Sequence, residues 1–119
     1  MTTIDAQEIA RLWTSWAVAG HQLSRVLAAR GSQFDSSLKN ARAVTYERAA
    51  ALLRASPDVE TAARLMIRNA VDAHVRTPPL IGFDRAALRY TVARTWQRCA
   101  LMLDPSLAEV QPRWTERAR

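Results

Sequence analysis

The chain is most clearly helical over residues 5–30, which read DAQEIARLWTSWAVAGHQLSRVLAAR. Asp5 and Glu8 have the spacing of a helix capping box, with Asp in place of the usual Ser or Thr. Behind them, apolar and small residues recur every three or four positions, at Ile9, Trp13, Trp16, Gly20, Leu23 and Leu27. This spacing predicts one continuous helix over about residues 6–30, with this apolar face turned to the core and Gly31 as its natural end.

Capping residues and prolines divide the rest of the chain into further helices. The sequence SQFDSS at residues 32–37 predicts a loop whose last residues cap the second helix. Ser56 and Pro57 suit the cap and first position of a third helix, Asp84 suits the cap of a fourth, and Asp104 with Pro105 suits the start of a fifth. The predicted helices therefore cover about 37–55, 57–76, 85–103 and 105–111, with a linker at 77–84 and a basic tail at 112–119.

The composition also favours helices. Of the 119 residues, 49% are hydrophobic, 22 are alanines and only 3 are glycines, whereas sheets prefer β-branched and aromatic residues. Small residues dominate the predicted stripe of the third helix, at Val59, Ala62, Ala63, Met66, Ala70 and Ala73. The fourth helix carries its stripe at Leu88, Val92, Trp96, Cys99 and Leu103. We expect a single all-α domain over residues 1–119, built as a compact bundle of four main helices plus a short C-terminal helix.

The charges are unusual in kind and in placement. The chain has sixteen arginines, one lysine (Lys39) and eleven acidic residues, which leaves a net charge of +6. Seven of the acids lie at predicted helix starts, where capping and the helix dipole account for them. Arginine grips phosphates and carboxylates with a planar fork of donors, so the excess indicates a polyanionic partner. A GC-rich genome, which favours Arg codons, remains an alternative explanation.

The arginines that we expect to bind phosphate lie in rows on helix bodies and in the tail. The two pairs Arg64/Arg68 and Arg94/Arg98 are each one helical turn apart, opposite the apolar stripes. Two more candidates are Arg113 and Arg117, beside Trp114, which could stack on a base or pack back onto the bundle. The alternative is a solvated face in which Arg68 pairs with Asp72 and Arg54 with Glu47.

Two segments can be compared with a DNA-binding helix-turn-helix. Gly20 and Val26 have the spacing of its turn, but Trp16 occupies a position that needs a small residue. The turn at residues 56–58 is the better candidate, and the helix after it would present Arg64 and Arg68 outward. A DNA-binding transcriptional regulator is therefore a third hypothesis.

The sequence contains no pattern typical of an enzyme. His21 and His74 have no neighbours at metal-ligand spacing, His21 falls on the polar side of the first helix, and Cys99 falls within an apolar stripe. We therefore predict a non-enzymatic protein without cofactor or metal. No signal peptide and no uncharged apolar run of membrane-spanning length is found, which favours a cytoplasmic protein without membrane contact.

The leading hypothesis is a small basic helical accessory subunit of a nucleoprotein complex that contacts the phosphate backbone of DNA or RNA. In size, charge and helix content the chain is similar to the small helical subunits of CRISPR-type effector complexes, a likeness of class without a shared motif. The alternative is a helical protein–protein adaptor or inhibitor of the phage or plasmid type that binds an acidic partner. Two further possibilities remain open. One is a ligand-binding bundle with a cavity beside Trp13 and Trp16, and the other is a homo-oligomer.

Overall fold

The computed structural model of the protein describes residues 5–75 and 83–110. Its elements are α1 (Ala6–Ala29), α2 (Gln33–Ala55), α3 (Val59–Val75), α4 (Phe83–Leu103) and a short 3₁₀ helix, η1 (Pro105–Val110). Within the described ranges there is no strand, and the predicted all-α bundle of four main helices is confirmed. The predicted short fifth helix is a 3₁₀ helix rather than an α-helix.

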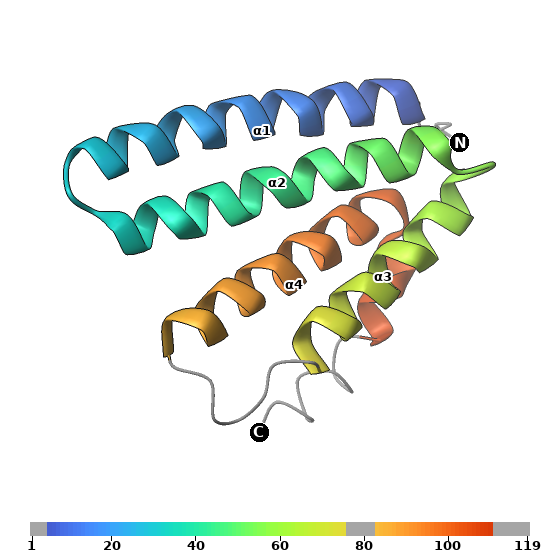
Figure 1. Cartoon of the computed structure of the whole chain (residues 1–119). Coiled ribbons are helices and arrows are strands. Elements are labelled where there is room, and N and C mark those ends of the chain that lie inside the picture. The colour runs from blue at the N-terminus through green and yellow to red at the C-terminus, as the bar shows by residue number, and fades with distance from the viewer. Residues whose placement is uncertain (1–4, 76–82, 111–119) are drawn as a thin grey trace.

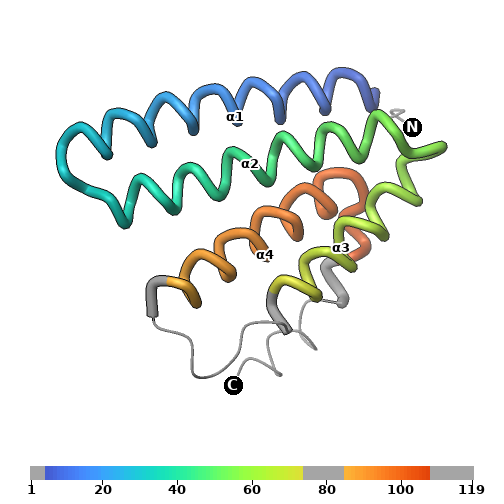
Figure 2. The backbone as a smooth tube through the Cα atoms, viewed as in Figure 1, coloured from blue at the N-terminus to red at the C-terminus, as the bar shows by residue number. Residues whose placement is uncertain are grey.

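The four helices form two antiparallel pairs. The α1–α2 pair is a long hairpin, and α4 lies between α2 and α3, as Figure 1 shows. The tube in Figure 2 makes the order α1, α2, α4, α3 easy to follow. The molecule measures 47 × 33 × 21 Å, so its thinnest dimension is about two helix diameters. Because α4 packs against both α2 and α3, it is covered on two sides, whereas α1 is covered mainly by α2.

The face that α1 buries differs from the predicted one by about one position. The buried residues of α1 are Ala10, Trp13, Ala17 and Ser24, while Leu23 of the predicted face is 43% exposed. The reason is a close approach of the two backbones at Gly20. A Cβ atom placed on Gly20 would lie only 3.0 Å from the Cβ atom of Ala43 on α2. The small residues allow this approach, and the larger ones flank it.

The second helix begins at Gln33, four residues before the predicted start, so residues 33–36 are helical and not a loop. A buried pair of serines accounts for the early start. Ser24 Oγ donates to the carbonyl oxygen of Ser36 at 2.9 Å, and Ser36 Oγ donates to the carbonyl oxygen of Ser24 at 2.8 Å. These bonds join the last turns of α1 to the first turn of α2, so a tertiary contact extends the helix through a polar stretch.

The turn between α2 and α3 corrects two predicted caps. Ser56 ends α2, because its hydroxyl donates to the carbonyl oxygen of Leu52 at 2.6 Å. Asp58 caps α3 instead, since its carboxylate accepts the N–H of Thr61 at 2.7 Å and this bond lowers the pKa of Asp58. Pro57 therefore lies outside the helix.

Of the other three predicted caps, Asp5 and Asp104 are confirmed and Asp84 is not. Asp5 caps α1 as predicted, and Asp104 accepts from the N–H of Ser106 at the start of η1. Because α4 begins at Phe83, two residues before its predicted start, Asp84 is a helical residue rather than a cap.

The core lies where α3 and α4 meet α2. Ala62, Ala63, Met66 and Ala70 are buried as predicted, and Cys99, Ala100 and Leu103 of α4 pack in the same core cluster. Trp13 of α1 is fully buried, and its indole N–H donates to Met102 Sδ at 3.4 Å. The predicted core role of Trp13 and the buried position of Cys99 are thus confirmed.

Candidate functional site

A concave surface rich in arginine lies between α2 and α4. We call it the arginine hollow. It has a volume of about 590 Å³. Its lining residues are Arg42 and Tyr46 of α2 and Tyr90, Thr91, Arg94, Thr95, Gln97, Arg98, Leu101 and Met102 of α4. Helical spacing explains the gathering, because Tyr90, Arg94 and Arg98 follow one another at single turns of α4.

Aromatic rings hold two of these arginines in place. Arg98 Cζ lies 5.4 Å from the centroid of the Trp16 ring, and Arg94 Cζ lies 6.0 Å from that of Tyr90. The Trp16 ring also meets the Tyr46 ring edge-on, at 5.3 Å between centroids. A guanidinium packed on a ring keeps its charge, and its donors that form no bond within the protein remain available to a ligand, so the contacts orient the cations without neutralising them.

The hollow is free of acidic groups. No residue that lines it is Asp or Glu, and in residues 5–75 and 83–110 no carboxylate forms an ion pair with Arg42, Arg94 or Arg98. Burial raises the pKa of Tyr46 in spite of the nearby Arg98 and Arg42 charges, so its hydroxyl keeps its proton at neutral pH. The lining of the arginine hollow therefore offers cations and neutral polar groups, which suit an anionic ligand.

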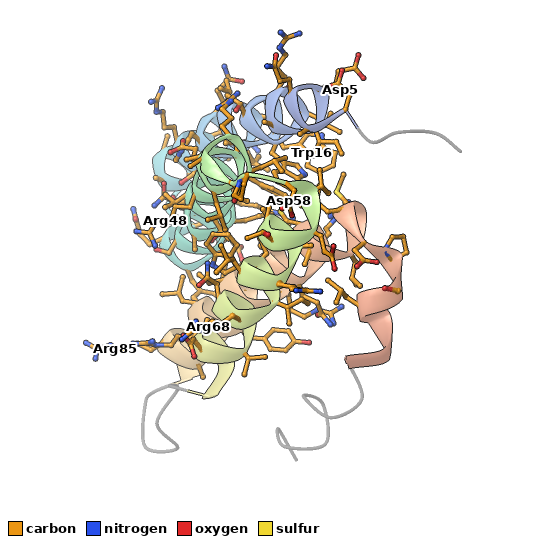
Figure 3. All side chains as sticks on the ribbon, turned by 90° about the vertical axis from the view of Figure 1, so that its right-hand side faces the viewer. Asp5, Trp16, Arg48, Asp58, Arg68 and Arg85 are labelled. Carbon is orange, nitrogen blue, oxygen red and sulfur yellow. The ribbon has the colours of Figure 1, made fainter. Side chains whose placement is uncertain are left out.

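The two predicted arginine rows lie in different surroundings. Arg94 and Arg98 line the arginine hollow, whereas Arg64 and Arg68 are exposed on α3 and do not line it. In Figure 3, Arg68 is labelled at the lower left of the molecule, whereas Trp16, which packs on Arg98, is labelled near the top. Arg64 forms an ion pair with Glu60 at 2.5 Å. The predicted Arg113, Arg117, Trp114 and His74 side chains lie outside the described residues.

A second hollow lies between α2, α3 and α4 and has a different character. Arg48, Asp72 and Trp96 are among its lining residues, and most of its surface is apolar. The acid at Asp72 offsets the single cation at Arg48. This hollow is accordingly a weaker anion site than the arginine hollow.

His21 lies at the edge of the contact between α1 and α2, where its side chain is partly exposed and meets polar residues of α2. Its Nε2 atom lies 2.5 Å from Glu47 Oε1, and its Nδ1 atom lies 3.1 Å from Asn40 Oδ1. Glu47 is therefore bound to His21, and Arg54 instead reaches Thr14 Oγ1 at 3.5 Å. These contacts join α1 to α2.

Neither a reactive thiol nor a metal site is found in the described part of the chain. Burial raises the pKa of the Cys99 thiol to about 12, so it is not a thiolate at neutral pH. No cluster of three or more His, Cys, Asp and Glu side chains there is placed to bind a metal ion. The described helices are also too short or too polar to cross a bilayer.

Sequence reasoning missed Arg42, Tyr46 and Tyr90. The signal for Tyr90 was present, because it precedes Arg94 and Arg98 at the same one-turn spacing. Arg42 and Tyr46 come from another helix, and only the packing of α2 on α4 brings them to the hollow.

Comparison with known proteins gave no match: no protein-family model, no curated protein and no solved structure matches this chain.

Proposed function

We propose that the protein is a non-enzymatic nucleic-acid-associated protein that binds phosphate groups of DNA or RNA in the arginine hollow. The single observation that carries the proposal is the convergence of Arg42, Arg94 and Arg98 from two helices on a surface without acids. Arginine binds a phosphate with two parallel hydrogen bonds, and a pair held by aromatic rings loses little freedom on binding. The net charge of +6 attracts a polyanion over a longer range.

The salt dependence of binding gives a quantitative test. Three cations that neutralise three phosphates give a slope of log K against log salt of about −2.1 for single strands and about −2.7 for duplex DNA. A rise from about 50 to about 200 mM salt should then weaken binding roughly 20- to 40-fold. An electrophoretic shift of single- and double-stranded DNA and RNA over this range measures the slope.

Two double variants locate the site. R94Q/R98Q removes two cations from the arginine hollow, and R64Q/R68Q removes two cations with the same spacing from α3. We expect the first to lower the salt slope by about two phosphate contacts, and the second to leave it nearly unchanged. If R64Q/R68Q causes the loss and R94Q/R98Q does not, the phosphate site lies on α3. If the wild-type protein shifts none of the four nucleic acids, the proposal is wrong.

A specific observation favours the adaptor as a second candidate function. Leu12, Leu23 and Val26 lie on one face of α1 and are 41%, 43% and 45% exposed. Between Ile9 and Arg30 the chain has no acidic residue, while Arg11 and Arg25 are exposed on α1. An exposed apolar stripe with arginines nearby and no acid after Glu8 in α1 complements an amphipathic helix with acidic flanks.

The adaptor is tested with a synthetic amphipathic peptide that has leucines on one face and glutamates beside them. We expect the peptide to shift backbone amide NMR signals of α1, and the L12S/V26S variant to abolish these shifts. Shifts confined to α4 would show that the peptide binds the arginine hollow and that the α1 face is not the docking surface.

A further inference from the structure

We infer that the arginine hollow is built for the nucleotides of a single strand, with an unpaired base stacked on Tyr90. The inference rests on the proposed function and names its substrate class. A hollow of about 590 Å³ lies in the size range of sites that enclose small ligands, about 300–1,000 Å³. Duplex DNA keeps its bases stacked inside and offers a recessed surface only its backbone, whereas a single strand can turn a base into the hollow.

Tyr90 supplies the stacking platform. Its side chain is 54% exposed although it lines the hollow, and Arg94 lies 6.0 Å from its ring centroid on one side. A ring that is half open to solvent at the mouth of a cationic recess has room for a base. Arg94 then stands beside the stacked ring, where it can contact the phosphate of the same nucleotide.

Gln97 adds an independent observation. Its side chain lines the hollow and is only 4% exposed, and its Oε1 atom accepts a hydrogen bond from Arg94 Nη1 at 3.2 Å. In the residues that the structure describes, the amide nitrogen of Gln97 has no hydrogen-bond partner. Buried donors are normally satisfied by protein, water or a ligand, and an acceptor on a bound ligand would satisfy this one. The edge of an unpaired base carries such acceptors, and in a duplex its pairing edge is occupied.

A neighbouring recess continues the path of the strand. We call it the leucine hollow. It is lined by Leu23, Leu27, Asp35, Leu38, Lys39, Arg42 and Thr91, and shares Arg42 and Thr91 with the arginine hollow. Lys39 precedes Arg42 by about one turn of α2, so cations continue along the groove beside apolar side chains that bases can cover. Asp35 at the start of α2 is the single acid of this lining and would repel phosphate there.

Fluorescence anisotropy with labelled oligonucleotides of about 12 nucleotides tests the inference, since single-strand sites cover about 4–16 nucleotides. The probes are oligo-dT, oligo-rU and a DNA duplex of the same length, each at low salt. We expect both single strands to bind at least about 10-fold more tightly than the duplex, because one stacked base contributes roughly 5- to 150-fold in affinity.

Variants of Tyr90 separate stacking from charge. Y90A and Y90L should weaken single-strand binding about 10-fold and leave duplex binding unchanged, while Y90F should stay within about twofold of the wild type. F34A is the control, because Phe34 is an aromatic residue with 36% exposure that is not among the lining residues of either hollow. Circular dichroism checks that each variant is folded.

The outcomes distinguish the inference from the proposed function. Equal affinity for single strands and duplex, or no effect of Y90A and Y90L on single strands, overturns the inference while phosphate binding stands. Absence of binding to every probe overturns both. A loss for Y90A, Y90L and F34A alike also overturns it, because the loss then does not depend on the hollow.

Discussion

The close approach of α1 and α2 makes a quantitative prediction for Gly20→Ala. The new Cβ atom would lie 3.0 Å from the Cβ atom of Ala43, whereas carbon atoms in favourable contact are about 3.5–4.0 Å apart. Ala43 is fully buried and its Cβ atom cannot rotate away. The helices must therefore separate by about half an ångström. The Ser24–Ser36 bonds one turn further along oppose that separation.

Two opposing terms set the size of the effect. Overpacking of a well-packed contact costs about 1–3 kcal/mol, and replacing a helical glycine with alanine returns about 1 kcal/mol. We expect Gly20→Ala to lower the free energy of unfolding by about 0–2 kcal/mol. Because these terms nearly cancel, the sharper quantity is the coupling between Gly20→Ala and Ala43→Gly, which should be about 1–3 kcal/mol.

Urea unfolding followed by circular dichroism measures this double-mutant cycle. The double variant moves one methyl group from α2 to α1, so it should be nearly as stable as the wild type and more stable than Ala43→Gly alone. Ala51→Gly is the matched control, because Ala51 is an exposed residue of α2 that loses only helix propensity. A coupling below about 0.5 kcal/mol for Gly20 and Ala43 would refute the close approach, since independent sites add within that margin.

Three further predictions concern the turns and the core. Gly31→Ala should lower the free energy of unfolding by about 1–2 kcal/mol in urea titrations, because Gly31 has a φ of 84° that an L residue adopts at that cost; an unchanged midpoint would contradict the turn. Cys99 should react with a thiol reagent in urea but not in native buffer, as burial raises its pKa to about 12; rapid native labelling would contradict its burial. Asp58→Asn should flatten the acid limb of the stability profile. The lowered pKa of Asp58 means that its carboxylate stabilises the protein above its ordinary pKa of 3.8, and that this contribution is lost as the pH falls. If the stability of the wild type and of Asp58→Asn falls identically with decreasing pH, the capping role of Asp58 is contradicted.

Much of the fold follows from local sequence, because helix formation depends on spacing and capping within one segment. The apolar stripe of α3 and the cap at Asp5 are properties of neighbouring residues, and both are confirmed. The buried position of Cys99 follows in the same way from its place between Trp96 and Leu103. Local periodicity thus determines the helices and their approximate ends.

Contacts between helices determined two features that the spacing of residues along the sequence did not: the buried face of α1 and the set of residues that form the arginine hollow. Periodicity gives the face of α1 only to within about one residue, and the choice between the Leu23 side and the Ser24 side depended on how near α2 can come at Gly20. The candidate site shows the same division. Arg94 and Arg98 form a row in the sequence, but Arg42 joins them only because α2 packs on α4. A sequence records distances along a helix, whereas a binding surface depends on distances between helices, which packing alone sets.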